Sequence, residues 1–183
     1  KYDVKSVLDY SAGWCARVLA SASLGAKYYG IDPLTADRVN QAIKYFGGEG
    51  ECIKGCSEDL DYSIFPQVDL SFSCPPYFDL EVYSSDLAQS SNKYKNYSDW
   101  LEYYWKTTVK KCYAKSKYFG FVTVEVVKKY KLLEDMSKVC TDLGGVLIEN
   151  TPIKVSKGHL SGKAKTGLVD KKTEHLVIYE VKN

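Results

Sequence analysis

The chain has 183 residues, a length that suits one domain with a substantial core. Its 25 basic and 23 acidic residues nearly balance, so net charge does not require a nucleic-acid partner. Arg17 and Arg38 are its only arginines, which disfavours sequence-specific reading of guanine, because that contact prefers the arginine fork. No apolar run approaches the about 18 residues of a membrane span, and no signal peptide is recognisable.

Strands and helices alternate through the first half of the chain. Short apolar runs predict strands, and the longer stretches between them predict helices. Gly25 and the pair Gly47-Gly48 are expected to end the two helices, and Thr35 is expected to cap the second one. The predicted strands cover 4–9, 26–32, 51–56 and 67–74, and the predicted helices cover 14–24 and 36–46.

The second half begins with an irregular polar loop over 79–97. Ser98 is then expected to cap a long helix that ends near Lys115. The remaining predicted elements are a strand over 118–126, a helix over 130–143 and strands over 146–155 and 174–181. No helix separates the last two strands, so we expect them to pair as an antiparallel hairpin. The pattern predicts an α/β, Rossmann-like fold: a seven-stranded, mostly parallel sheet with helices on both faces and an antiparallel edge strand.

The cysteine pattern excludes a zinc ribbon. Cys52 and Cys56 form the only close pair, and no second pair or histidine cluster completes four ligands. We therefore predict no metal site and reduced thiols, several of them in apolar runs, which indicates a reducing, intracellular compartment. The chain begins at Lys1 and its only methionine is Met136, so we expect it to be an excerpt of a longer chain.

Acidic residues follow each of the first three predicted strands. Asp9 ends the first strand and precedes a small-residue turn that opens a helix, where a ligand can approach the backbone closely. Asp32 ends the second strand, a position suited to accept hydrogen bonds from ribose hydroxyls. Glu58 and Asp59 follow the third and could receive an adenine amino group. The spacing does not match the G-x-G-x-x-G pattern, so a pyrophosphate site is poorly supported.

A Pro-Pro pair follows the fourth predicted strand, in the run 73–78 (SCPPYF). Two adjacent prolines cannot continue a strand ladder, and they hold the backbone carbonyls and the next aromatic ring in a stiff turn. The carboxyl ends of parallel strands form the edge where open α/β sheets bind ligands. The run is therefore the best candidate for the reacting part of a site.

These segments occur in the order of the motifs of a known enzyme family. Together they resemble class I S-adenosylmethionine-dependent methyltransferases and, more narrowly, the phage- and virus-type amino-methyltransferases of DNA. Those enzymes carry Asp, Asn or Ser, then Pro-Pro, then Tyr or Phe. The resemblance covers nearly the whole chain and rests on the segments 9–17 (DYSAGWCAR), 30–33 (GIDP), 57–59 (SED) and 74–78 (CPPYF).

The resemblance implies a single methyltransferase domain over 1–183 that binds S-adenosylmethionine. Asp9 and the loop after it would hold the methionine part, Asp32 the ribose and the third acidic cluster the adenine. The implied cofactor-binding residues are Asp9, Ser11, Ala12, Gly13, Asp32, Ser57, Glu58 and Asp59.

The resemblance also implies direct methyl transfer to an exocyclic amine, adenine N6 or cytosine N4. Cys74 and the Pro75 carbonyl would orient the amine, so positioning supplies much of the catalysis. Tyr77 or Phe78 would stack on a flipped-out base. The implied catalytic residues are Cys74, Pro75, Pro76 and Tyr77, and the implied substrate-binding residues are Phe78, Tyr83, Lys93, Lys157, Lys163 and Lys165.

Cys74 departs from the family pattern, because a thiol is a weak hydrogen-bond acceptor. Orientation of the amine would then rest on the Pro75 carbonyl or on Ser73. A slow enzyme, an altered geometry and a loss of activity all stay open. A covalent role for Cys74 in carbon methylation is disfavoured, because no histidine lies nearby in sequence to activate it.

The predicted partner is a nucleic acid, with DNA favoured over RNA. The loop over 154–173 places six lysines, of which Lys154 is the first, beside several glycines, and it could contact phosphates. The chain has little room for target recognition, which a flanking segment or a partner subunit could supply. RNA methylation, methylation of a protein glutamine and a non-catalytic cofactor- or nucleic-acid-binding module are the alternatives. The predicted location is the cytoplasm, including that of an infected host cell.

Overall fold

The computed structural model describes residues 2–80, 85–153 and 173–182. Its strands are β1 (Ser6–Asp9), β2 (Lys27–Asp32), β3 (Gly50–Lys54), β4 (Val68–Ser73), β5 (Ser116–Val124), β6 (Val146–Ile153) and β7 (Glu174–Glu180). Its main helices are α1 (Ala16–Ser23), α2 (Ala36–Tyr45), α5 (Thr107–Tyr113) and α6 (Leu132–Asp142). Shorter helical segments are η1 (Tyr62–Ile64), α3 (Ser90–Lys93), α4 (Tyr97–Asp99) and η2 (Trp100–Lys106).

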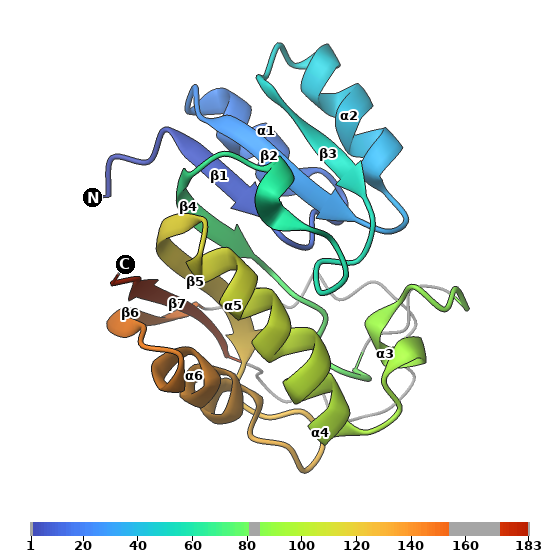
Figure 1. Cartoon of the computed structure of the whole chain (residues 1–183), viewed down its shortest axis with the longest axis vertical. Helices are drawn as coiled ribbons and strands as arrows, with labels where there is room; N and C mark the ends of the chain where they lie inside the picture. The colour runs from blue at the N-terminus through green and yellow to red at the C-terminus, as the bar shows by residue number, and fades with distance from the viewer. Residues whose placement is uncertain (1, 81–84, 154–172, 183) are drawn as a thin grey trace.

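The seven strands form one sheet in the order β3-β2-β1-β4-β5-β7-β6 (Figure 1). The first five strands pair in parallel, and β7 pairs antiparallel with both β5 and β6. The predicted fold class and the antiparallel pairing of the last two strands are therefore confirmed. β7 lies between β5 and β6, so β6 is the outermost strand, a detail that hydrophobic patterning cannot supply.

Helices cover both faces of the sheet. Tyr28 of β2 packs with Val18, Val39 and Ile43 of α1 and α2, whereas Ile31 belongs to the core that includes α5 and α6. Side chains three residues apart on a strand point to opposite faces, so the two cores lie on the two sides of the sheet. Figure 1 shows α1 and α2 beside β1–β3, and α5 and α6 beside β5.

The long predicted helix begins earlier than expected. It starts at Tyr97 with Asn96 at its N-cap, so Ser98 lies inside the helix and does not cap it. The segment η2 has π-helical geometry, whose wider turn brings residues five apart closer to one face. Trp100, Tyr104 and Trp105 are consequently all buried.

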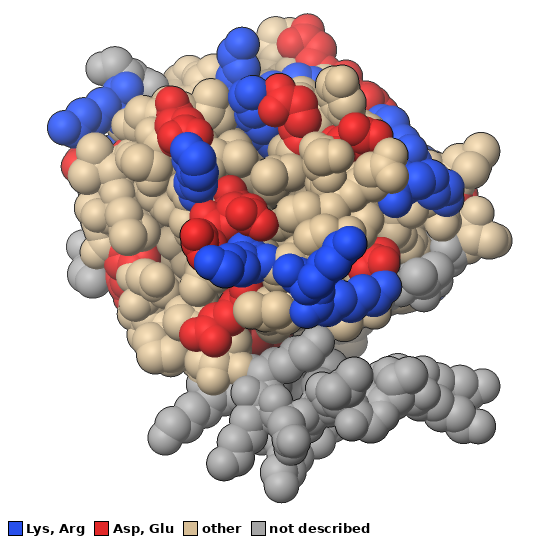
Figure 2. Space-filling view, turned by 90° about the horizontal axis from the view of Figure 1, so that it is seen from below, with Lys and Arg blue, Asp and Glu red and all other residues tan. Residues whose placement is uncertain are grey.

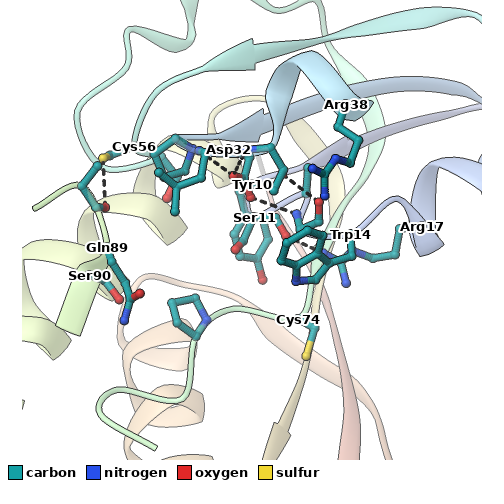
Figure 3. A pocket seen from close by; sticks show the side chains of 18 of the residues that line it. Tyr10, Ser11, Trp14, Arg17, Asp32, Arg38, Cys56, Cys74, Gln89 and Ser90 are labelled. Atoms are coloured by element: carbon teal, nitrogen blue, oxygen red, sulfur yellow. Dashed lines mark hydrogen bonds between the residues drawn. The ribbon is translucent and has the colours of Figure 1, made fainter. Parts of the chain in front are cut away.

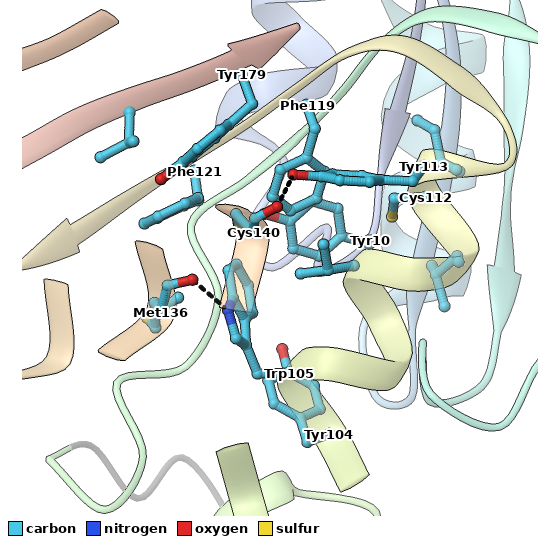
Figure 4. Close-up of a cluster of buried hydrophobic side chains, with 14 of the residues drawn as sticks. Tyr10, Tyr104, Trp105, Cys112, Tyr113, Phe119, Phe121, Met136, Cys140 and Tyr179 are labelled. Carbon is cyan, nitrogen blue, oxygen red and sulfur yellow. Dashed lines mark hydrogen bonds between the residues drawn. The ribbon is translucent and has the colours of Figure 1, made fainter. Parts of the chain in front are cut away.

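The larger core is built from aromatic rings around β5 (Figure 4). Phe119 stacks on Tyr10 with ring centroids 5.4 Å apart, and Phe121 meets Trp105 edge-on at 5.1 Å. Two of these rings have satisfied polar ends: Trp105 Nε1 donates to the Met136 carbonyl at 3.1 Å, and the Tyr10 hydroxyl donates to the Gly120 carbonyl at 3.0 Å. Such satisfied rings combine a large apolar contact with fixed orientation, and they give the central strands a rigid support.

The six cysteines are free thiols, three of them buried, as the sequence predicts. Among the residues described, no helix has both the length and the apolar character needed to cross a membrane.

Candidate functional site

A cavity of about 790 Å³ lies at the carboxyl ends of β1, β2, β3 and β4 (Figure 3). This is within the size range of small-molecule and cofactor pockets. Eight of the residues that the sequence singled out line it: Ser11, Ala12, Gly13, Asp32, Ser57, Glu58, Cys74 and Pro76.

The loop after β1 is tied to the end of β2. Gly13 adopts a left-handed conformation with φ +60°, and its N–H donates to Asp32 Oδ2 at 2.9 Å. Thr35 stands at the N-cap of α2 as predicted, but its hydroxyl donates to the Gly13 carbonyl at 2.7 Å and not to the helix. The loop therefore holds its backbone against the cavity in a defined shape.

Asp32 is buried, and its carboxylate already accepts three backbone hydrogen bonds. Besides Gly13, the amides of Leu34 and Thr35 donate to Oδ1, both at 2.8 Å. A carboxylate offers about four lone-pair sites, so Asp32 retains capacity for about one further donor. The sequence suggested that Asp32 receives both ribose hydroxyls; the local geometry leaves room for one.

Asp9 lies beneath the cavity and is fully buried. Its Oδ2 accepts from Arg17 Nε at 2.7 Å and from the Tyr28 hydroxyl at 2.8 Å. Its Oδ1 accepts from the Ser73 hydroxyl at 2.8 Å and from the Ser11 amide at 3.3 Å. Asp9 thus joins β1, α1, β2 and β4, and it can reach a ligand only through Arg17 or the Ser11 loop.

Arg17 lines the cavity and bridges Asp9 and the Ser11 carbonyl. Burial alone would lower the pKa of Arg17, but the Asp9 carboxylate more than offsets this and raises it. Arg17 is therefore a permanent cation at this end of the cavity. Arg17 lies in the segment 9–17, but the sequence alone did not indicate a role for it at the site.

The acidic cluster after β3 divides between the cavity and the surface. Glu58 lines the cavity and accepts from Lys93 Nζ at 2.9 Å and from the Tyr94 hydroxyl at 3.2 Å. Asp59 lies outside the lining and pairs with Lys93 at 2.6 Å. Burial lowers the pKa of Lys93, but the hydrogen bonds that it donates to the Asp59 and Glu58 carboxylates more than offset this and raise the pKa. Lys93, predicted to contact substrate, is therefore engaged with the two acids that were predicted to bind the cofactor.

Three smaller polar residues complete this end of the cavity. The Ser57 hydroxyl pairs with that of Thr108 at 3.1 Å. Cys56 donates to the Ala88 carbonyl at 3.4 Å, and burial, with the neighbouring Glu58 charge, raises the pKa of its thiol to about 11. Ser90 lines the cavity, and its hydroxyl is buried without a partner among the described residues.

The Pro-Pro turn presents only part of its predicted residues to the cavity. Cys74 and Pro76 line it, whereas Pro75, Tyr77 and Phe78 do not. Phe78, at φ +53°, is buried and meets Tyr97 and Tyr130 edge-on. In this structure neither ring is therefore exposed for the predicted stacking of Tyr77 or Phe78 on a substrate base.

A hydrogen-bonded chain runs from Cys74 away from the cavity. Cys74 Sγ lies 3.2 Å from the Tyr77 hydroxyl, which donates to Glu174 Oε1 at 3.3 Å. A tyrosine hydroxyl has one proton, so its use toward Glu174 makes the Cys74 thiol the donor to Tyr77. The sulfur is then oriented to act as an acceptor toward the cavity. Burial raises the pKa of Tyr77, which keeps its hydroxyl protonated at neutral pH.

Several lining residues carry no role in the sequence motifs. They are Trp14, Arg17, Arg38, Gln41, Gln89, Ser90 and Tyr104. One signal could have found two of them: both arginines of a lysine-rich chain line the same cavity. The predicted substrate residues Tyr83, Lys157, Lys163 and Lys165 lie outside the described residues, as do most of the loop over 154–173 and part of 79–97.

No protein-family model matches the chain, and no curated protein sequence matches it either. Solved structures do. A TehB-like SAM-dependent methyltransferase from Corynebacterium glutamicum has a TM-score of 0.62 and 12% identity over 97% of this chain and 80% of its own. The chain therefore has a methyltransferase fold.

Two further structures share this fold. Burkholderia thailandensis 1,6-didemethyltoxoflavin-N1-methyltransferase, solved with 1,6-didemethyltoxoflavin and S-adenosylhomocysteine, has a TM-score of 0.64 and 9% identity over 97% of this chain and 71% of its own. TrmN from Thermus thermophilus has a TM-score of 0.62 and 14% identity over 97% of this chain and 44% of its own. At such low identity the likeness shows the fold alone and does not select a target.

Proposed function

We propose that the chain is an S-adenosylmethionine-dependent methyltransferase that methylates an exocyclic amine of a nucleobase, adenine N6 or cytosine N4, in DNA. One observation carries the proposal. A single cavity is lined by residues that follow the ends of four neighbouring strands of a methyltransferase-fold sheet: Ser11, Asp32, Glu58 and Cys74. Segments far apart in sequence thereby form one site of cofactor size.

The residues of the cavity fit the cofactor. Asp32 has capacity for one ribose hydroxyl, and Glu58 and Ser90 line the end of the cavity that would receive the adenine. The Ser11–Gly13 loop, the start of α1 and the Arg17 cation suit the charged methionine end. When bound, S-adenosylmethionine supplies a methyl group on a sulfonium that is open to attack by a nucleophile.

The Cys74 turn would orient the target amine. The lone pair of an exocyclic amine is conjugated with its ring, so the amine becomes a better nucleophile when acceptors hold its N–H bonds and localise that pair. Cys74 Sγ, with its proton directed to Tyr77, lines the cavity and would be one acceptor, whereas the second predicted acceptor, the Pro75 carbonyl, lies outside the lining. Holding the amine in line with the methyl group is the main contribution of these residues.

The target base must leave its stack to reach the cavity. A base in a single strand has no pair to break, so its extrusion costs the least free energy. Single-stranded nucleic acid is therefore the expected best substrate. RNA shares the required amine chemistry and stays the main alternative, with protein glutamine less favoured. A flanking segment or partner subunit would add target recognition, since Arg17 is engaged with Asp9 and leaves Arg38 alone for the arginine fork.

Calorimetric titration and methyl transfer test the proposal together. The folded chain should bind S-adenosylmethionine, and labelled methyl should reach single-stranded DNA ahead of duplex DNA, RNA and a protein pool. Nucleoside analysis should then find N6-methyladenine or N4-methylcytosine. Transfer to carbon would instead identify Cys74 as a covalent nucleophile. A folded chain that binds no cofactor would contradict the proposal.

The non-catalytic alternative rests on Cys74, which replaces a stronger acceptor. Cys74→Asn and Cys74→Ser separate the two readings. If the wild-type chain binds cofactor without transfer and either variant transfers methyl, the thiol has disabled the site. If the wild type transfers and the variants change its rate little, the Cys74 side chain does not set the orientation of the amine. Absence of transfer in all three, with cofactor bound, would favour a binding module.

A further inference from the structure

One aromatic ring at the cavity differs from all the others in its exposure. Among the described residues, three aromatic side chains line the cavity, and Tyr10 and Tyr104 are 1% and 4% exposed, whereas Trp14 is 66% exposed. An exposed tryptophan at a cavity mouth is unusual, because burial of its large apolar surface is strongly favourable. Its free surface is therefore a candidate ligand contact.

The backbone holds Trp14 out of the core. The residues on either side of it, Gly13 at φ +60° and Cys15 at φ +73°, are both left-handed. The left-handed conformation is rare for a residue with a side chain, so the path of the chain at Cys15 is specific to this loop. It delays the start of α1 to Ala16 and leaves Trp14 in the loop, although the sequence pattern places Trp14 in the helix.

The Trp14 ring is supported from one side. The Arg38 guanidinium, from the first turns of α2, lies 5.2 Å from the centroid of the Trp14 ring. A guanidinium at this distance orients an indole through a cation–π contact. Arg38 also adds positive charge at the cavity mouth, which favours a substrate with phosphates.

The position of Trp14 matches the substrate end of the cavity. Figure 3 shows Trp14, Arg17 and Cys74 at one end and Cys56, Gln89 and Ser90 at the other. The second end holds the groups assigned above to the adenine of the cofactor. A base whose amine meets Cys74 must lie at the first end, where Trp14 is the exposed aromatic ring.

We propose that Trp14 is the stacking surface for the target base, in place of the buried rings of Tyr77 and Phe78. This rests on the proposed function and deepens it. Base–aromatic stacking tolerates every base, because each has a π face. The substrate class is thus a nucleobase of a single-stranded or flipped-out nucleotide, held between the Trp14 ring and the amine-orienting turn.

Tryptophan fluorescence provides a direct test. Trp100 and Trp105 are fully buried, so Trp14 is the tryptophan that a bound base can reach. Titration of the wild-type chain, with S-adenosylhomocysteine present, by a single-stranded oligodeoxynucleotide should quench the fluorescence. This quenching should be absent in Trp14→Phe, whereas binding of the oligonucleotide, measured by calorimetry, should persist. An RNA oligonucleotide forms the second arm, and stronger quenching by RNA would assign the polymer to RNA.

The energetic test compares Trp14→Ala with Tyr45→Ala, which removes an exposed aromatic ring outside the cavity lining. Loss of one base stack should weaken oligonucleotide affinity about tenfold in Trp14→Ala, with Trp14→Phe between it and the wild type. The cofactor affinity should stay unchanged in both, and Tyr45→Ala should have no effect on either affinity.

A loss of cofactor affinity without loss of oligonucleotide affinity would overturn the proposal and place Trp14 over the cofactor. Unchanged affinity for both ligands would also overturn it. If the wild-type chain bound no cofactor, that result would instead contradict the proposed function.

Discussion

The two halves of the sheet are held together by different forces. Around β1 and β2, buried carboxylates organise the structure: Asp9 accepts four hydrogen bonds and Asp32 accepts three. Around β5 and β7, stacked and edge-on aromatic rings such as Phe119, Phe121 and Tyr179 fill the interior. The first half is polar at its strand ends, and the second half is apolar.

This difference explains where the cavity lies. Charged and hydrogen-bonded groups keep fixed directions only when their partners are in place, so the polar half can hold a small ligand in one orientation. The aromatic half cannot donate such contacts, but it supports the Cys74 turn from below through Phe78 and Tyr97. The cavity lies at the carboxyl ends of β1, β2 and β3, and the Cys74 turn after β4 lines its side toward the aromatic half.

The largest effect is expected at Asp9. Asp9→Asn keeps the shape but removes the charge opposite Arg17, and an amide cannot accept all four hydrogen bonds. Breaking a buried ion pair by removing one partner costs about 3–5 kcal/mol, measured as the free energy of unfolding in urea. Asp142→Asn, which breaks an exposed pair with Lys138, should cost less than about 1 kcal/mol. Equal losses in the two variants would contradict the organising role of Asp9.

A smaller effect is expected in the aromatic half, at Met136. Met136→Leu conserves volume and retains the backbone carbonyl that accepts from Trp105, and it loses the sulfur that accepts a weak hydrogen bond from Thr123 Oγ1 at 3.6 Å. Such exchanges usually cost less than about 1.5 kcal/mol. The free energy of unfolding in urea should be clearly higher for this variant than for Asp9→Asn. If Met136→Leu were as destabilised as Asp9→Asn, the contrast between the two halves would be wrong.

The smallest effect is expected at Tyr77, on turnover. Tyr77→Phe removes the hydroxyl that accepts from the Cys74 thiol, so the sulfur is no longer oriented toward the proposed target amine. Loss of one hydrogen bond of about 1 kcal/mol should lower the rate of the proposed methyl transfer roughly fivefold. Glu174→Gln should show a smaller loss, because a glutamine oxygen still accepts from Tyr77. Tyr179→Phe, which removes a hydroxyl bonded to Ser137 outside the cavity, serves as the control. A rate unchanged in Tyr77→Phe would mean that the hydroxyl does not position Cys74.

Local sequence carried much of the fold and part of the site. The Gly13 turn, the acid at the end of β2 and the Pro-Pro turn could be predicted, because each depends on residues a few positions apart. The saturation of Asp9 could not, since its partners Tyr28 and Ser73 are 19 and 64 residues away. The start of the helix at Tyr97 also differs from the expected Ser98 cap, because tertiary packing of Trp100 and Trp105 sets the helix geometry there.

The sequence by itself determined the alternation of strands and helices, the hairpin at the end of the chain and the strand ends at which the cavity lies. These follow from hydrophobic period and turn chemistry, which act within a few residues. Only the tertiary structure decided which side chains face the cavity. It buried Tyr77 and Phe78, engaged Lys93 with two acids and exposed Trp14, because the direction of a side chain depends on contacts between segments that are distant in the sequence.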